Sequence, residues 1–404
     1  MSRILIWSPN YAPELIGIPP LVTEAAEWLV QRGHDVDVVT ALPNYPDRRI
    51  FPGYRGRVWQ RTRTNNVAIH RSWLRVRPGE SFLDKGLYEA SFAASSTLLA
   101  FRRVRHADVL VCLLPTVFTT ALGAAAARVS GTRFVVWVQD LVLAAALSVD
   151  GVGSTQRRML RGLRSVESSA LRAADRVVSC SPGFVAYLSS LGVNRAAVDV
   201  IPNWVDTEFV AERPPRGLSR PVRFLYTGNV GYTQGLETLF EAGRLVSDGV
   251  ELTIAGGGNG LEAARQAARG AATFVPLVSR VEYPALLASA DALVVVQRAV
   301  AANANLPSKI ASYLASGRPI VASIGLDTPA AELLHASGGA LIVPPGAPAL
   351  LAEAMTRIRD DASLRASLGR RGRAYAEEQL SKERVLPRLE RAIIGGEPGN
   401  DGLG

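Results

Sequence analysis

A proline, a serine and a lysine at the start of a predicted helix form a pattern that could bind phosphate. Pro307 is followed by Ser308 and Lys309, then by an amphipathic stretch that Gly317 ends and Pro319 cannot continue. Proline is tolerated in the first turn of a helix, since its missing N–H would be unpaired there. The N–H groups of Ser308 and Lys309 would then lie at the positive end of about three helical turns, beside an ammonium group. An ordinary helix-to-strand connection with a solvated lysine explains this stretch equally well.

Two glycine-containing turns follow predicted strands in the same half of the chain. Gly228 and Asn229 end one strand, with Gln234 just before the next helical stretch, and Gly256 and Gly257 end another strand. Glycine lets the backbone approach a bulky anion closely, and amide side chains can donate to its oxygens. A nucleotide phosphate, ribose or base would suit such turns, but a tight connection between a strand and a helix would also explain them.

Charged side chains at strand ends complete the candidate site. Arg298 follows a strand, and with Lys309 it could neutralise a diphosphate, the arginine through its fork and the lysine as a point charge. Asp140 ends a strand in the first half, where it could contact sugar hydroxyls or accept a proton, or simply cap a helix over 141–146. Gly17, in a loop before the first helix, could admit a sugar phosphate close to the backbone.

The elements that must position these residues alternate between apolar strands and amphipathic helices. Near-continuous apolar strands separated by helices predict α/β folding, with parallel sheets covered on both faces. The predicted strands are 3–8, 36–40, 67–72, 109–113, 134–139, 176–180 and 198–201, then 222–227, 251–255, 273–275, 292–296, 320–323 and 340–343.

A stretch rich in proline and charge at 206–221 divides the two series of strands. We therefore predict a Rossmann-like domain over 1–205, a linker over 206–221 and a second Rossmann-like domain over 222–375. A helix over 376–396 would pack back on the first domain, and 397–404 would form a flexible tail. Ligands of such sheets lie beyond the carboxyl ends of the strands, so we expect a cleft between the two sheets.

Positive charge is concentrated in the first half. The net charge is +9, and nine arginines crowd one stretch: Arg48, Arg49, Arg55, Arg57, Arg61, Arg63, Arg71, Arg75 and Arg77. An anionic membrane or an acidic substrate could use this charge, but a compositional bias toward arginine would also produce it. The apolar and aromatic stretch 86–105, which ends in arginines, resembles a helix that lies on a membrane. We predict no nucleic-acid partner, because no binding module or set of stacking aromatics is recognisable.

Several other classes of site and location are disfavoured. Cys112 and Cys180 lie far apart in apolar or small-residue surroundings, which favours buried thiols in a reducing compartment. Asp35 and Asp37 alternate along a strand rather than forming a metal motif, and His70 is the one histidine kept as a candidate base. Residues 109–127 carry no charge, but Pro115 divides them into a strand and a helix rather than a membrane span. The predicted location is the cytoplasm, with peripheral contact at the inner face of the cell membrane as an extension.

The chain resembles the retaining glycosyltransferases of family 4 with the GT-B fold, and among them the enzymes of exopolysaccharide, colanic-acid-type, biosynthesis. The resemblance covers nearly the whole chain. It rests on the motifs at 11–18, 26–34, 43–47, 51–55, 138–141, 174–184 and 201–206, together with 228–237 and the stretch 306–321. The run Phe51-Pro52-Gly53-Tyr54-Arg55 is particularly specific.

The resemblance implies transfer of a sugar from a nucleotide-diphosphate-sugar donor with retention of anomeric configuration. The second domain would bind the donor and the first the acceptor, with neither a metal nor a further cofactor. Two donor-binding glutamates common in family 4 correspond here to Ala304 and Ser312. The usual arginine and lysine of the first turn are replaced by Asn229 and Gln234, so Lys309 and Arg298 would substitute for them.

Our hypothesis is a transferase in which Lys309, Arg298 and backbone N–H groups stabilise the departing diphosphate. Asp140 would orient sugar hydroxyls, and the donor site would include Gly17, Gly228, Asn229, Gln234, Gly256, Gly257, Ser308 and Ser312. The acceptor would be a polysaccharide, a lipid-linked sugar or a natural product. Two other functions stay open: a non-catalytic subunit that binds a nucleotide sugar, favoured by the missing glutamates, and a nucleotide-sugar epimerase.

Overall fold

The chain divides into two compact units, each described here by itself. The computed structural model describes residues 1–77, 82–148, 153–210, 221–246, 248–299 and 306–395. Unit 1 comprises Met1–Glu14, Ile18–Pro202 and Val385–Gly404, and unit 2 comprises Leu15–Gly17 and Asn203–Arg384. The sequence predicts that the first domain ends at 205 and that the chain returns to it at 376. In the structure, the chain leaves unit 1 after Pro202 and returns to it after Arg384.

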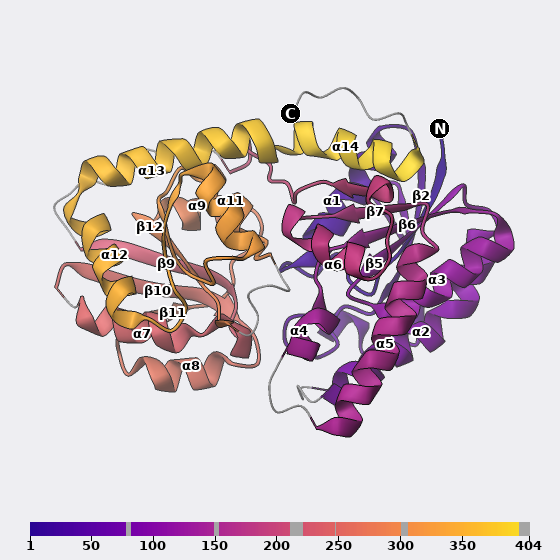
Figure 1. Cartoon of the computed structure of the whole chain (residues 1–404), viewed down its shortest axis with the longest axis horizontal. Coiled ribbons are helices and arrows are strands. Elements are labelled where there is room, and N and C mark those ends of the chain that lie inside the picture. Colours follow the sequence, from indigo (N-terminus) through magenta and orange to yellow (C-terminus); the bar gives the residue numbers. More distant parts are fainter. Residues whose placement is uncertain (78–81, 149–152, 211–220, 247, 300–305, 396–404) are drawn as a thin grey trace. The chain divides into compact units, whose positions relative to one another are not determined.

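Unit 1 is built on an eight-stranded sheet in the order β3-β4-β2-β1-β5-β6-β7-β8. Figure 1 labels β2, β5, β6 and β7 of this sheet. All neighbouring strands are parallel except β3, which runs antiparallel to β4 at the edge. The central strands read as continuous apolar runs because helices cover both of their faces. The strands are β1 Arg3–Trp7, β2 Asp35–Ala41, β3 Trp59–Thr64, β4 Val67–Ser72, β5 Val109–Leu114, β6 Arg133–Val138, β7 Arg176–Ser179 and β8 Val198–Val200.

The helices of unit 1 begin and end where local chemistry allows. The first turn of α1 contains Pro19 and Pro20, which fit because the first N–H groups of a helix have no intrahelical partner. Gly131 ends α3 in the left-handed conformation, at a φ of 69°. The helices are α1 Ile18–Gln31, α2 Phe82–Val104, α3 Val117–Ser130, α4 Val142–Ser148, α5 Ser154–Arg172 and α6 Val185–Ser190.

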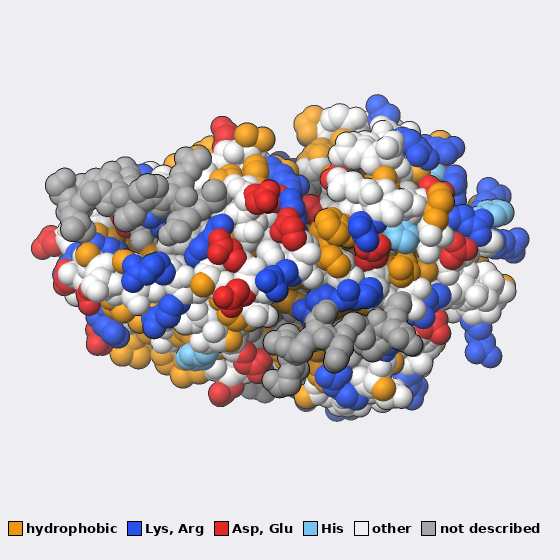
Figure 2. All heavy atoms as spheres, turned by 90° about the horizontal axis from the view of Figure 1, so that it is seen from above, with side chains coloured by type: hydrophobic (Ala, Val, Ile, Leu, Met, Phe, Trp, Pro, Cys, Tyr) orange, Lys and Arg blue, Asp and Glu red, His pale blue; other side chains and the backbone are white. Residues whose placement is uncertain are grey.

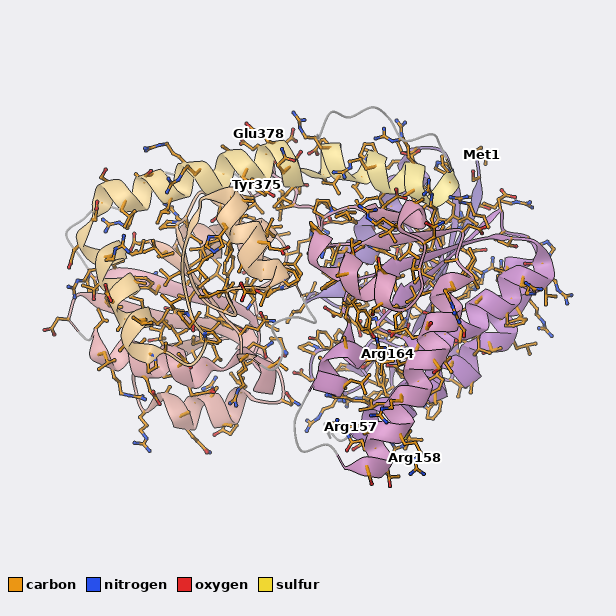
Figure 3. The ribbon with its side chains drawn as sticks, in the orientation of Figure 1. Met1, Arg157, Arg158, Arg164, Tyr375 and Glu378 are labelled. Atoms are coloured by element: carbon orange, nitrogen blue, oxygen red, sulfur yellow. The ribbon has the colours of Figure 1, made fainter. Side chains whose placement is uncertain are left out.

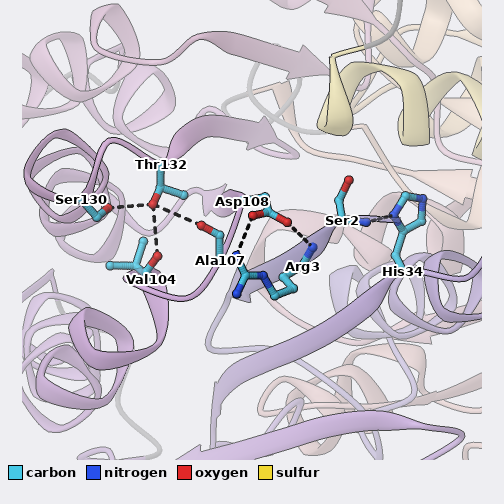
Figure 4. Close-up of polar contacts among 8 residues, drawn as sticks. All are labelled: Ser2, Arg3, His34, Val104, Ala107, Asp108, Ser130 and Thr132. Atoms are coloured by element: carbon cyan, nitrogen blue, oxygen red, sulfur yellow. Dashed lines mark hydrogen bonds and ion pairs between the residues drawn. The ribbon is translucent and has the colours of Figure 1, made fainter.

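Polar contacts connect the starts of neighbouring strands in this sheet (Figure 4). The carboxylate of Asp108, just before β5, accepts the backbone N–H of Arg3 at 2.8 Å and its guanidinium at 3.0 Å. The N–H of Ser2 donates to Nδ1 of His34 at 3.1 Å, and the Thr132 hydroxyl donates to two carbonyls at the end of α2 and just after it. These bonds hold β1, β2, β5 and β6 in register.

The last helix, α14 (Lys382–Ile394), belongs to unit 1 from Val385 onward. Glu390 accepts from Nε of Arg32 at 3.3 Å and bonds Nε2 of His34 at 3.1 Å. Since Nδ1 of His34 accepts from Ser2, its proton lies on Nε2 and is donated to Glu390. Nε of Arg133 donates to the carbonyl of Ile393 at 2.9 Å.

Unit 2 is built on a six-stranded parallel sheet in the order β11-β10-β9-β12-β13-β14. Because the order reverses beside β9, the crevice beyond the carboxyl ends of β9 and β12 is the place where such folds bind ligands. The strands are β9 Val222–Asn229, β10 Val250–Gly257, β11 Thr273–Val275, β12 Ala292–Val296, β13 Ile320–Ser323 and β14 Ala340–Val343. The helices are α7 Leu236–Leu245, α8 Leu261–Ala268, α9 Tyr283–Ala288, α10 Lys309–Ala315, α11 Pro329–Ser337, α12 Pro348–Asp360 and α13 Ala362–Tyr375, and a π-helical turn follows at Ala376–Leu380.

The predicted strands are all present, with bounds that differ by no more than two residues. The edge strand β3 was missed.

The uncharged stretch 109–127 forms β5 and the first part of α3, as predicted. The amphipathic stretch at 86–105 forms most of α2, in which Phe92, Ala93, Ala100 and Val104 are buried while Leu87 and Leu98 are exposed. That this helix lies on a membrane stays a prediction. Within the described ranges, no helix combines the length and apolar character needed to span a bilayer.

Candidate functional site

Lys309 and Gly228 meet at the carboxyl edge of the unit 2 sheet. Lys309 is the first residue of α10, and Gly228 lies near the end of β9 with a φ of 112°. A Cβ atom at position 228 would stand 3.4 Å from Nζ of Lys309. The bare backbone at Gly228 therefore makes room for the lysine side chain, as well as adopting a conformation that other residues avoid.

The start of α10 differs in detail from the prediction. The helix begins at Lys309 with Ser308 as its N-cap, so Pro307 precedes the helix instead of occupying its first turn. It spans seven residues, shorter than the three turns expected. Its end is as predicted, because Gly317 adopts a φ of 69° and donates its N–H to the carbonyl of Leu314 at 3.1 Å.

The ammonium of Lys309 lies over an aromatic ring. Its Nζ is 3.6 Å from the ring centroid of Tyr226, which is within the range of a cation–π interaction. Burial lowers the pKa of Lys309 to about 7. Among the described residues, no carboxylate forms an ion pair with this lysine. An anion bound beside Nζ would favour the charged form and raise this pKa again.

A network of four hydroxyl groups joins β9, α9 and α10 beneath this lysine. The backbone N–H of Thr227 donates to the Tyr313 hydroxyl at 2.8 Å, and Oγ1 of Thr227 lies 3.1 Å from the same oxygen. The Tyr283 hydroxyl lies 3.2 Å from Oγ1 of Thr227 and 3.1 Å from Oγ of Ser312. Ser312 donates to the carbonyl of Lys309 at 2.9 Å. The network connects the residue before Gly228 to the first turn of α10.

The sequence predicted Ser312 as a donor contact but missed the tyrosines that bond it. Tyr283 and Tyr313 are separated from Thr227 by 56 and 86 residues, so only the fold brings them together. Their apolar neighbours make them look like ordinary core aromatics in the sequence. Tyr226, one residue before Thr227, was likewise missed as the ring beneath Lys309.

The glycines after β10 pack against the turn after β9. A Cβ at Gly256 would overlap the carbonyl oxygen of Gly228, and one at Gly257 would stand 3.1 Å from Leu277. The N–H of Val230 also donates to the carbonyl of Gly257 at 2.8 Å. The structure thus provides a packing reason for these glycines, whereas the sequence suggested room for a nucleotide.

Asn229 and Gln234 belong to the same turn. Oε1 of Gln234 accepts the N–H of Gly231 at 3.0 Å, and a Cβ at Gly231 would contact both amide side chains at 3.2 Å. These two amides therefore shape the turn beside Gly228. Gly17, the other glycine expected to contact a ligand, has a φ of 78° and is grouped with unit 2.

Arg298 lines a pocket of unit 2. Its guanidinium forms an ion pair with Glu237 at 2.7 Å, and its N–H donates to the carbonyl of Thr233 at 2.9 Å. The pocket has about 400 Å³ of empty volume and is lined by Gly235, Glu237, Thr238, Gln297, Arg298 and Ser323, among others. Lys309 does not line it. The structure thus places the Arg298 guanidinium beside a carboxylate.

Asp140 lies in unit 1, just after β6. Burial raises its pKa to about 7, and none of the described residues donates a hydrogen bond to its carboxylate. Burial raises the pKa of Tyr45 to about 12, and the negative charge of Asp140 adds to this effect. Helix α4 begins at Val142, so Asp140 lies one residue too early to be its N-cap.

Glu14 positions the segment that carries Tyr45, a role that was missed in the sequence. Its Oε1 accepts the N–H groups of Asn44 at 2.8 Å and Tyr45 at 2.9 Å, and Asn10 donates to Oε2. Burial raises the pKa of Glu14, against the lowering effect of these hydrogen bonds.

Within the part of the chain that the structure describes, no group of His, Cys, Asp and Glu side chains could hold a metal ion.

Comparison with known proteins assigns the family. A glycosyl transferase 4-like domain matches residues 17–204, and a glycosyl transferases group 1 domain matches residues 221–361. The chain is 32% identical over 413 residues to the "Putative colanic acid biosynthesis glycosyl transferase WcaI" of Escherichia coli (strain K12), covering 97% of this chain and all of that protein. The chain belongs to the family 4 glycosyltransferases.

Solved structures show the same fold at low identity. The sucrose-phosphate synthase of Thermosynechococcus elongatus matches with a TM-score of 0.75 and 18% identity, over 97% of this chain and 98% of that one. HepE of Anabaena, solved with UDP-glucose, matches with a TM-score of 0.70 and 15% identity over 97% and 99%. WaaG, from lipopolysaccharide biosynthesis, matches with a TM-score of 0.70 and 14% identity over 97% and 100%. The predicted GT-B fold is confirmed.

Proposed function

We propose that this glycosyltransferase moves a sugar from a nucleotide-diphosphate-sugar donor to an acceptor of exopolysaccharide synthesis, with retention of anomeric configuration. The observation that carries the donor half of this proposal is the Lys309 ammonium, held over Tyr226 against the bare backbone of Gly228. A cation without a carboxylate partner, beside a glycine turn at the carboxyl edge of a parallel sheet, suits a diphosphate. HepE, a protein of the same fold, is solved with UDP and with UDP-glucose, which supports a uridine nucleotide as the first donor to test.

Lys309 would act on the leaving group. As the bond from the anomeric carbon to the diphosphate breaks, negative charge grows on the phosphate oxygen, and a nearby ammonium stabilises it. In the free protein the pKa of Lys309 is about 7, so part of the lysine is uncharged at neutral pH. The developing charge on the phosphate would therefore also favour its protonated form.

Retention would then need no nucleophile from the protein. The acceptor oxygen forms its bond to the anomeric carbon on the face that the diphosphate leaves, and the acceptor proton passes to the departing phosphate oxygen. We propose that no metal takes part, since Lys309 and backbone N–H groups would offset the phosphate charge.

The acceptor half of the proposal rests on Asp140 in unit 1. A carboxylate with a pKa raised to about 7, and with no donor from the described residues, can accept a hydrogen bond from a sugar hydroxyl near neutral pH. The acceptor is a polysaccharide, a lipid-linked sugar or a natural product, and the similarity to WcaI favours an exopolysaccharide intermediate. A cytoplasmic location and contact with an anionic membrane remain part of the proposal.

The experiment is a panel of UDP-, GDP- and dTDP-sugars, assayed for transfer and for donor hydrolysis with the full chain and with Lys309→Ala. Lys85→Ala is the matched control, because Lys85 is an exposed lysine of α2 in the other unit. We expect loss of turnover only in Lys309→Ala. Unchanged turnover and unchanged nucleotide affinity in that variant would refute the assignment of Lys309.

Product analysis separates this proposal from its alternatives. In place of the donor-binding glutamate, Ser312 bonds Tyr283 and the Lys309 carbonyl, which is the one observation that favours a non-catalytic binding subunit. Position 304, where the other glutamate would stand, lies outside the described residues. Donor binding without turnover across a wide set of acceptors would support that alternative, and an epimerised donor formed without acceptor would support an epimerase.

A further inference from the structure

The whole net charge of the chain comes from one segment of unit 1. Residues 48–77 contain nine arginines and no aspartate or glutamate, and the remaining residues contain equal numbers of basic and acidic side chains. The face drawn in Figure 2 carries both blue and red side chains. A single-sign segment of this size produces a strong local potential.

The structure folds much of this segment into the antiparallel edge of the sheet. In β3, Trp59, Arg61 and Arg63 alternate with partly buried residues, so all three project from one exposed side of the edge strand. No carboxylate of the described residues pairs with Arg57, Arg61 or Arg63. By contrast, Arg75, near the end of the same segment, and Arg103 of α2 form ion pairs with aspartates.

Large apolar side chains are exposed at the end of this strand. Val58 is 73% exposed, Trp59 57% and Trp73 42%. The N–H of Trp73 donates to the carbonyl of Val58 at 2.8 Å, which fixes these residues at one end of the β3–β4 ladder. By strand alternation Val58 and Trp73 lie on the side of this edge opposite to Trp59, Arg61 and Arg63. We call Arg57, Trp59, Arg61 and Arg63 the β3 edge surface.

Charge alone would have a simpler explanation. Charged side chains on an edge strand prevent it from pairing with another sheet, and arginines at alternate positions serve that purpose. Exposed tryptophan and valine do not, because they increase the tendency of an edge to associate. A surface that combines arginine with exposed tryptophan matches the interface of a bilayer, where indole rings lie at headgroup depth and cations meet anionic lipids.

We propose that the β3 edge surface binds the chain to an anionic lipid membrane. The arginines supply attraction to the headgroups, and Trp59, which projects from the same side of β3 as Arg61 and Arg63, enters the interfacial layer. On α2, the helix that the sequence indicated for this role, Phe92, Ala93 and Ala100 are buried in packing unit 1. This inference extends the membrane contact in the proposed function, but its test does not depend on transfer activity.

The test is sedimentation of the full chain with vesicles of phosphatidylcholine and phosphatidylglycerol, at low salt and at raised salt. We expect binding that weakens with salt and is absent with phosphatidylcholine alone. The triple variant Arg57→Gln/Arg61→Gln/Arg63→Gln should bind about a hundredfold more weakly, since each arginine near an anionic surface contributes about fivefold.

The matched control removes three exposed arginines of α5, as Arg158→Gln/Arg161→Gln/Arg172→Gln. Figure 3 labels Arg158 on this helix, which belongs to the same unit. Both triple variants lose the same charge, so a general electrostatic effect would weaken both equally. Unfolding curves that match the unmodified chain would show that neither variant has lost its fold.

The apolar contribution has its own readout. The difference in fluorescence between the unmodified chain and Trp59→Phe should shift to shorter wavelength on addition of anionic vesicles, because the Trp59 indole leaves water. Loss of binding in the β3 variant but not in the α5 variant, together with this shift, would support the proposal. Equal effects of the two variants, no vesicle binding at low salt, or binding to soluble heparin without a Trp59 shift on vesicles would overturn it.

Discussion

Two cations at the carboxyl edge of the unit 2 sheet have opposite surroundings. Arg298 forms an ion pair with Glu237 at 2.7 Å, beside a pocket at the start of α7. Lys309 lies over the Tyr226 ring, with a pKa lowered to about 7 and no carboxylate partner among the described residues. The arginine charge is already balanced within the protein, whereas the lysine charge is left for a ligand to balance. The residue types alone suggested equal roles for the two.

The largest effect should come from removing the lysine. We expect Lys309→Met to lower turnover by roughly 100–1,000-fold, the size typical of losing one preorganised group that stabilises a developing negative charge. Arg298→Met should lower turnover by at most about tenfold, since Glu237 already balances its charge. Steady-state kinetics with the donor found in the panel measures both. A larger loss of turnover in Arg298→Met than in Lys309→Met would indicate that the phosphates bind in the pocket at the start of α7.

The pH dependence of nucleotide binding should sharpen the same contrast. A bound diphosphate raises the pKa of Lys309, so binding takes up a proton when the lysine is neutral. Above pH 7 the affinity for UDP should therefore fall by up to about tenfold per pH unit, until the pH reaches the pKa of the complex. Calorimetric titrations between pH 7 and 9 measure this slope.

Lys309→Met is the control for this profile, because it carries no titrating group at position 309. Its affinity should be weak and nearly independent of pH over the same interval. An equal slope in both proteins would mean that another group is responsible. For the stability of the free protein the sign is the opposite: burial of a charged Lys309 disfavours folding, and this penalty shrinks as the pH rises from 7 toward the pKa of an exposed lysine.

The sequence predicted the strands beside the two cations but not the groups that surround each cation. Buried parallel strands carry long apolar runs, so β9, β10 and β12 could be placed from the sequence to within two residues. The edge strand β3 was missed because Trp59–Thr64 has no such run. The ion pair between Arg298 and Glu237 joins residues on different elements, and no local pattern announces it.

The hydroxyl network was beyond sequence reasoning for a similar reason. Thr227, Tyr283 and Ser312 come from β9, α9 and α10, and each looks unremarkable among its own neighbours. Local patterns predicted the helix start near Lys309, because proline and glycine punctuate the chain directly. What surrounds the lysine is decided by the packing of three distant segments.

Gly228 lies against Lys309 and Gly235 lies against Arg298, so substituting each glycine by alanine perturbs one of the two cations. Gly228→Ala should cost about 1–3 kcal/mol of stability, because a φ of 112° is strained for alanine, and its Cβ would press on Lys309. Gly235→Ala should cost a similar amount, since its φ is 65° and its Cβ would stand 2.9 Å from Cγ of Arg298. Urea unfolding measures the stability of both variants.

The two glycine variants should differ in ligand binding. Only Gly228→Ala should weaken the affinity for UDP by several-fold, because it displaces the lysine proposed to hold the phosphates. Calorimetric titration at pH 7 gives both affinities. Equal losses in the two variants would show that the binding site extends to Arg298.

The smallest effect should come from the network that holds Lys309 in place. Tyr283→Phe removes the hydrogen bonds to Thr227 and Ser312, and we expect a loss of about 0.5–1.5 kcal/mol in the free energy of unfolding. Ser312→Ala removes one of the same bonds, so the double variant should lose less than the two single losses combined. If the network positions the lysine, both single variants should also lower the slope of UDP affinity against pH, which a purely structural role would leave unchanged. Additive losses of stability, with the slope intact, would reduce the network to ordinary core packing and leave Tyr226 and Gly228 as the groups that place the lysine.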